Sequence, residues 1–380
     1  TKLATLGVDN RSTATTILAI RALIELQGDS VLEPRARKLL SFTDNRQDAS
    51  LQAGHFNDFA QVALLRSALH KAARSRGETG LQHHELSRAV FEAMELRFDE
   101  YAADPAVRGP ARTGTHDALR RVIEYHLYRD LERGWRVTAP NLEDCGLIRF
   151  EYEGLKGVDG LLVEKELWEE GLTVRRGNSD EFVAVPGPLR ACTAETREEL
   201  LCTLLDVLRR SLAIKVDVLD PQKQLDLVEQ TKPRLREDTV WYLEDPRDLV
   251  KARVAYPRSR IKNQKGADSA SFLPVSSYSG FGRYLKRALK GCVPEGTRFG
   301  RDDVDETIRF LFLALQRYGI VEQVRSGRDV TDPGYQINAA AIRWLPGDGE
   351  IRPVDRTRIL QTGEMPPEVK PDDDAVWISG

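Results

Sequence analysis

One short segment constrains the fold of this chain more than any other. Residues 39–43, with the sequence LLSFT, have the length and apolar character of a buried strand, and the polar run DNRQD follows directly at residues 44–48. A long helical pattern comes next and places Phe56 and Phe59 largely on one face. A strand, a polar turn and a helix in this order predict an α/β unit.

The rest of the chain favours helices over strands, so we predict a mostly α fold with an α/β portion. Residues 74–80 resemble a hinge, and residues 102–115, rich in Pro, Gly and Ala, resemble a loop. Apolar residues at helical spacing predict helices at residues 12–27, 82–100, 116–133, 194–212, 282–290 and 303–318.

The last compact unit, residues 266–345, has the pattern of a winged-helix-like domain. Two predicted helices are followed by strands at residues 319–324 and 335–344, joined by a turn. Arg325 and Arg328 fall in that turn, the wing, where they could contact DNA. Because many such units serve only to pack against proteins, the pattern leaves both roles open.

A basic stripe on the first of these two helices is one of two candidate sites. Arg283, Lys286, Arg287 and Lys290 are spaced i, i+3, i+4 and i+7, so all four cations share one helix face. Like charges at this spacing repel one another, which favours an external anion such as DNA phosphate. The alternative is a solvated helix face without a ligand.

The polar turn after the predicted strand at residues 39–43 is the other candidate site. In open α/β sheets, ligands bind beyond the carboxyl ends of the strands, where Thr43, Asn45, Arg46 and Gln47 lie. The guanidinium of Arg46 matches the geometry of a phosphate. The alternative is that Asp44 and its neighbours only cap the following helix and form ion pairs.

Composition argues against a strongly basic nucleic-acid module. The 380 residues include 56 basic and 59 acidic side chains, a formal net charge of −3, so any DNA contact must be a local patch. No cysteine pair or histidine spacing matches a metal signature, and we expect no metal site. No apolar run reaches the roughly 20 residues that span a bilayer, so we expect no membrane association.

The sequence contains none of the motifs that hold ATP. It has no Gly-Lys pair, and therefore no phosphate-binding P-loop. It also lacks a D-E-x-H run for magnesium and a Q-x-x-G-R-x-G-R arginine-finger run. Since no catalytic constellation replaces them, we assign no catalytic residue and no cofactor to these 380 residues.

Three runs carry a resemblance to a known family. Residues 38–50 resemble motif IV of superfamily 2 helicases, and the following LQAGHFNDF at residues 51–59 is similar to the large bacterial DEAD/DEAH-box helicases. The run NLEDCGL at residues 141–147 is similar to another segment of the same helicases.

The resemblance implies an organisation for the chain. Residues 1–75 would start the second RecA-like motor domain, and residues 76–265 would be a mostly helical insertion that ends in the winged-helix-like unit at 266–345. Residues 346–380 would form an extended linker. Because the chain starts at Thr1 rather than Met, we expect a segment of a longer protein.

The parent protein implied by the resemblance is a cytoplasmic DNA helicase or translocase. It would use ATP and magnesium, act on duplex or single-stranded DNA, and carry its remaining motor domains in the same chain. The alternative is a protein–protein interaction module inserted in a helicase, without direct nucleic-acid binding, and the net charge of −3 favours it.

Overall fold

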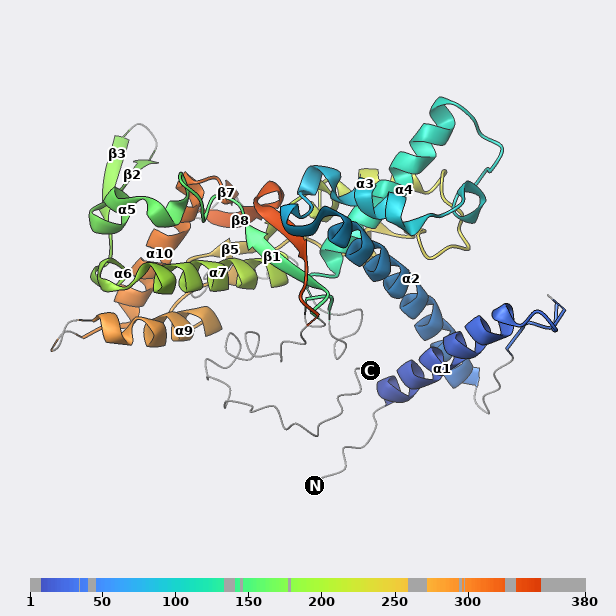
Figure 1. Cartoon of the computed structure of the whole chain (residues 1–380). Helices are drawn as coiled ribbons and strands as arrows, with labels where there is room; N and C mark the ends of the chain where they lie inside the picture. The colour runs from blue at the N-terminus through green and yellow to red at the C-terminus, as the bar shows by residue number, and fades with distance from the viewer. Residues whose placement is uncertain are drawn as a thin grey trace, which may run out of the picture.

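The computed structural model has a mixed α/β fold in which helices pack around a curled sheet (Figure 1). It describes residues 8–33, 35–39, 46–132, 141–143, 146–176, 179–258, 272–293, 296, 298–324 and 333–349, with side chains described from residue 15 and, in the second helix, for residues 53, 54 and from 56 onward. The predicted strand at residues 39–43 lies outside these residues except for Leu39. Most of the predicted linker at residues 346–380 also lies outside them.

The helices follow the apolar periodicity of the sequence. They are α1 (Val8–Gly28), α2 (Arg46–Arg76), α3 (His83–Met94), α4 (Pro110–Arg129), α5 (Lys165–Glu169), α6 (Gly187–Ala191), α7 (Ala194–Arg210), α8 (Gln224–Thr231), α9 (Gly280–Ala288) and α10 (Arg301–Arg317). The predicted loop at residues 102–115 is shorter than expected because α4 begins at Pro110. Proline fits the first helical turn, where its missing N–H has no intrahelical partner.

The strands of the described ranges form three separate sheets. They are β1 (Ile148–Tyr152), β2 (Gly171–Arg176), β3 (Ser179–Ala184), β4 (Ile214–Lys215), β5 (Val254–Tyr256), β6 (Phe272–Pro274), β7 (Val321–Val324), β8 (Gly334–Asn338) and β9 (Ile342–Pro346). In the largest sheet β8 pairs in parallel with β4 and antiparallel with β5 and β7, and β6 continues it in parallel from β5. β1 pairs antiparallel with β9, and β2 with β3.

The predicted second strand at residues 335–344 is divided into two strands. A short 3₁₀ turn, Ala339–Ala341, separates β8 from β9, and the Asn338 side chain accepts a hydrogen bond from the Ala340 N–H at 3.0 Å. β8 stays in the main sheet beside β7, as a hairpin requires, while β9 leaves it to pair with β1. The C-terminal unit is thereby tied to a strand nearly two hundred residues earlier.

One hydrophobic core joins most of the described chain. It extends from Leu65 on α2 to Trp344 on β9 and includes the leucines of α7. No described side chain of α1 belongs to this core; α1 lies at one end of the molecule against the first half of α2 (Figure 1). All three regions predicted from the sequence before residue 346 contribute to the core, and their boundaries at residues 75, 265 and 345 stay predictions.

Candidate nucleic-acid interface

The four cations predicted to share a face do so on α9 and the turn after it. Ser279 caps the helix, since its Oγ accepts a hydrogen bond from the Gly282 N–H at 3.1 Å. Phe281 and Leu285 are buried on the inner face, whereas the opposite face is exposed. We call this exposed face the α9 cation face; it comprises Arg283, Lys286, Arg287 and Lys290.

The α9 cation face has little local neutralisation. The sequence of α9 contains no acidic residue, and within the described ranges no ion pair is formed by Lys286, Arg287 or Lys290. Arg283 donates from Nη1 to the backbone oxygen of Tyr278 at 2.7 Å. Like charges held at helical spacing without acids beside them are suited to an external anion.

Contacts on its buried face hold α9 in place. The helix packs against α7 and α10, and the Tyr284 hydroxyl donates to Oε1 of Glu199 on α7 at 2.6 Å. The exposed face of α10 begins with the acidic residues Asp302, Asp303 and Glu306. An anionic ligand is therefore favoured along α9 and disfavoured along the first turns of α10.

The structure does not place the other predicted DNA-binding residues on the α9 cation face. Arg46 and Gln47 lie in the first turn of α2, and their side chains are outside the described residues. Thr43, Asn45, Arg325 and Arg328 also fall outside the described ranges. The first half of α2 and the α9 helix lie at opposite ends of the molecule in Figure 1, so the two candidate sites are separate in space.

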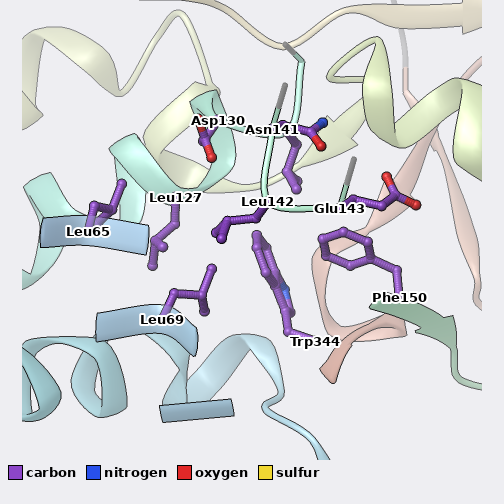
Figure 2. Close-up of a pocket in the computed structure, with 10 residues that line it drawn as sticks. Leu65, Leu69, Leu127, Asp130, Asn141, Leu142, Glu143, Phe150 and Trp344 are labelled. Carbon is purple, nitrogen blue, oxygen red and sulfur yellow. The ribbon is translucent and has the colours of Figure 1, made fainter. Parts of the chain in front are cut away.

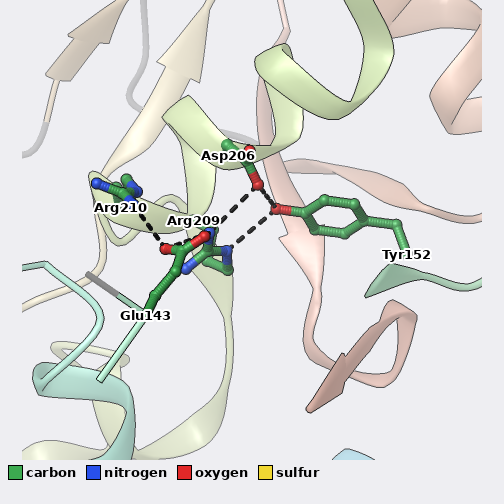
Figure 3. A network of polar contacts seen from close by, with 5 residues as sticks. All are labelled: Glu143, Tyr152, Asp206, Arg209 and Arg210. Carbon is green, nitrogen blue, oxygen red and sulfur yellow. Dashed lines mark hydrogen bonds and ion pairs between the residues drawn. The ribbon is translucent and has the colours of Figure 1, made fainter. Parts of the chain in front are cut away.

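Sequence reasoning missed a buried polar cluster, the Arg209 network, formed by Glu143, Tyr152, Asp206, Arg209 and Arg210 (Figure 3). The fully buried Arg209 donates from Nη2 to both Glu143 oxygens at 2.9 Å and to Asp206 Oδ1 at 3.2 Å. Its Nε donates to the Tyr152 hydroxyl at 3.1 Å, which in turn donates to Asp206 at 2.7 Å.

The Arg209 network explains part of the run at residues 141–147. Glu143 also accepts a hydrogen bond from Arg210 at 2.8 Å, and the Arg209 guanidinium lies 3.9 Å from the centre of the Phe150 ring. Burial, together with the Asp206 carboxylate, raises the pKa of Tyr152 well above its ordinary value. Glu143 therefore anchors its segment to α7, which is a structural role. An acid and an arginine at i, i+3 within the leucine stripe of α7 were the available signal.

A depression beside the Arg209 network offers little room for a ligand. Its outline encloses about 290 Å³, part of it open solvent, while the enclosed portion could hold about one water molecule. Figure 2 shows that Leu65, Leu69 and Leu142 face into it together with the Trp344 ring. Its acidic lining residue Asp130 is already paired with Arg66 at 2.8 Å. This is a gap in apolar packing, and it does not have the form of a substrate site.

Three of the described histidines contact other side chains in or beside the core. His83 contacts the Tyr128 hydroxyl at 2.9 Å and His116 the Tyr101 hydroxyl at 2.6 Å, while His126 contacts the Gln61 amide at 3.0 Å. Burial lowers the pKa of His126 to about 3, so this ring is neutral in the folded protein at physiological pH. Among the residues that the structure describes, no group of three His, Cys, Asp or Glu side chains could hold a metal ion.

Comparison of the chain with protein families, with curated proteins and with solved structures gave no match. The resemblance of residues 38–59 and 141–147 to large helicases therefore stays a prediction from the sequence. No helix in the described part of the chain has the length and apolar character needed to cross a membrane.

Proposed function

We propose that this chain is the accessory and partial motor region of an ATP-dependent DNA helicase or translocase, and that it contributes contacts to the nucleic-acid backbone. The observation that carries the proposal is the α9 cation face, on which the exposed side chains of Lys286, Arg287 and Lys290 form no ion pair within the described ranges. The helicase-like runs at residues 38–59 and 141–147 support the same assignment.

In this proposal the C-terminal unit is winged-helix-like. α9, α10 and the β7–β8 hairpin follow one another as that pattern requires. The helix before the hairpin would ordinarily read the DNA groove, but α10 carries Asp302 and Asp303 in its first turn and buries much of its surface. We therefore assign the DNA contact to α9 and expect it to involve phosphates more than bases.

The start of a RecA-like domain at residues 1–75 belongs to the same proposal, as does a cytoplasmic location. The P-loop, the magnesium ligands and the arginine finger would come from the remaining motor domains of the parent. This region alone would not hydrolyse ATP, because it has no residues placed to hold the β- and γ-phosphates.

A salt series tests the proposal directly. Binding of the chain to labelled duplex and single-stranded DNA is measured by anisotropy at increasing salt, for the wild type and for Arg287→Ala with Lys290→Ala. Each phosphate contact contributes about 0.9 to the slope of log K against log salt for duplex and about 0.7 for single strands. The double variant should therefore lower the slope by about 1.8 or about 1.4.

The matched control is Arg74→Ala with Arg88→Ala, which removes the same charge from exposed positions on α2 and α3. If both double variants weaken binding equally, the contact is diffuse attraction and the α9 assignment is wrong. Absence of binding to either DNA at low salt contradicts the proposed function.

A second candidate function has its own observation. Leu18, Ile24 and Val31, in and just after α1, are 70%, 55% and 90% exposed, outside the main core. Together with the net charge of −3, this favours a protein-interaction module. Replacing Leu18 and Ile24 by Ser should then leave DNA binding unchanged and abolish association with the partner, which mixing with the parent's remaining domains would detect.

A further inference from the structure

An exposed aromatic ring borders the α9 cation face. Tyr278 lies in the turn between β6 and α9, residues 275–279, which we call the Tyr278 turn. Its neighbours Val275 and Ser276 are each 1% exposed, whereas Tyr278 is 57% exposed. The backbone of the turn is thus packed into the protein while the ring is left in solvent.

Side chains from two helices hold the Tyr278 turn. Asp305 on α10 accepts hydrogen bonds from the Ser277 N–H at 2.6 Å and from the Ser277 hydroxyl at 3.1 Å. The Ser279 hydroxyl donates to the Ser276 oxygen at 2.7 Å. A Cβ at Gly282 would lie 2.1 Å from that same oxygen, so the turn packs directly on the α9 backbone. The ring is therefore presented from a fixed support, which lowers the entropy lost on binding.

Two arginines flank the ring. The Arg301 guanidinium lies over one face at 4.6 Å from the ring centre, and its Nη1 donates to the Tyr278 hydroxyl at 2.8 Å. Arg283, a member of the α9 cation face, donates to the Tyr278 backbone oxygen. With Arg301 over one face and the residue 57% exposed, the opposite face is the one that a flat ligand can reach.

An aromatic platform beside a track of cations is the arrangement by which proteins bind single-stranded nucleic acid. We propose that Tyr278 stacks on one unpaired base of a single strand whose phosphates run along the α9 cation face. The inference rests on the proposed nucleic-acid function and specifies its ligand. A duplex does not meet the requirement, since its bases are already stacked within the helix and a surface ring cannot reach their faces.

The acids near the platform limit the path of the strand. Asp302 and Glu306 are exposed on α10 and repel phosphate there. Asp305 is engaged with Ser277 and supports the turn. The strand is therefore directed from Tyr278 along α9 toward Lys290.

The test compares two strands of equal length, about 12 nucleotides, that differ only in their bases. One is oligothymidine and the other is an abasic sugar–phosphate strand of the same charge. One stacked base is worth about a 5- to 150-fold change in affinity, so the wild type should prefer oligothymidine by a factor in that range. Tyr278→Ala should abolish the preference and leave binding of the abasic strand and its salt slope unchanged. Tyr278→Phe should retain the preference.

Phe182 provides the matched control, because it is an aromatic residue of similar exposure, 59%, on the distant β3 strand. Phe182→Ala should retain the full preference for oligothymidine. Repeating the series with oligouridine and an abasic ribose strand distinguishes DNA from RNA, and a preference that depends on Tyr278 in either sugar series supports stacking.

The outcomes separate this inference from the proposed function. Equal wild-type binding of both strands, or a preference that survives in Tyr278→Ala, overturns stacking and leaves the backbone contact standing. An equal loss of both strands in Tyr278→Ala also overturns it, because the residue would then only support the α9 face. Failure of the wild type to bind any single strand at low salt overturns stacking, and failure to bind duplex DNA as well overturns the proposed function.

Discussion

The arginines of this molecule occupy two contrasting environments, one buried and one exposed. In the Arg209 network, the fully buried Arg209 side chain meets Glu143, Asp206 and the Tyr152 hydroxyl and lies over the Phe150 ring. On the α9 cation face, Lys286, Arg287 and Lys290 are exposed and form no ion pair within the described ranges. Arg209 therefore has acidic partners within the fold, whereas these three cations form no ion pair among the residues that the structure describes.

The difference shows which arginines are available for a ligand. A buried charge persists only if partners replace the water it has lost, so the fold had to bring together Glu143 and Asp206 from distant segments. An exposed charge has no such requirement, and water solvates it at little cost. The Arg209 network therefore contributes to stability, whereas the α9 cation face remains free to exchange water for phosphate.

The largest change in the free energy of unfolding should come from a substitution that removes Arg209 from its network. Arg209→Met keeps much of the side-chain volume but removes the Arg209 cation from Asp206, which is 6% exposed, while Glu143 keeps its ion pair with Arg210. The free energy of unfolding should fall by about 3–5 kcal/mol, as measured by urea titration, because the buried Asp206 carboxylate loses its ion pair with Arg209.

Arg317→Met is the control for this prediction. Arg317 forms an ion pair with Glu164 at 2.8 Å, but its side chain is 45% exposed. Its replacement should cost less than about 1 kcal/mol. Equal losses in the two variants would show that burial and partnering do not distinguish the two kinds of arginine.

A half-buried acid, Glu124, should behave differently from both sets of arginines. Glu124 on α4 is near Arg120 and Arg121, but these donate to Asp117 and to Gln230. Burial, and secondarily the Asp217 carboxylate, raises the pKa of Glu124 to about 7. Because the folded-state pKa lies above the unfolded one, the unfolded protein loses this proton first as pH rises, and stability falls between the ordinary pKa and about 7.

Glu124→Gln should therefore be more stable than the wild type at about pH 8.5, by about 1–3 kcal/mol once solvent screening is allowed for. Below about pH 4 the difference should disappear, since the wild-type carboxyl is then protonated in both the folded and the unfolded state. Urea unfolding at both pH values measures the difference. Glu92→Gln, at an exposed position of α3, is the control and should track the wild type. A constant difference across pH would contradict an uncharged, buried Glu124.

The parts that the sequence predicted well are those set by local spacing. The apolar periodicity of α7 and α10 and the cation spacing at Arg283 to Lys290 depend on residues three or four positions apart, and the structure has these helices. The pairing of β1 with β9 and the meeting of Glu143 with Arg209 depend on residues far apart in the chain. No local pattern encodes such meetings, because they follow from how the whole core packs.

The exposed position of Tyr278 likewise could not be predicted from the sequence. In the sequence it is one tyrosine in a serine-rich stretch, SSYSG, with no periodic signal. Its exposure follows from Asp305 and Gly282, which hold the backbone of the turn down, and its stacking partner Arg301 comes from the next helix. The cations of α9 could be predicted because they share one helix, whereas the platform beside them is assembled from three elements.

The smallest effect on stability should come from the α9 cation face itself. Lys286→Gln, Arg287→Gln and Lys290→Gln together spare Arg283, which supports the Tyr278 turn. The free energy of unfolding should change by no more than about 0.5 kcal/mol, and any change should be a gain, since like charges three and four residues apart repel. The gain should disappear as salt is raised, because exposed charges are screened. A loss of more than about 1 kcal/mol would mean that these side chains have partners within the protein. In that case these three side chains would be stabilised by contacts inside the protein, as Arg209 is. The proposal that they bind phosphate would then be wrong.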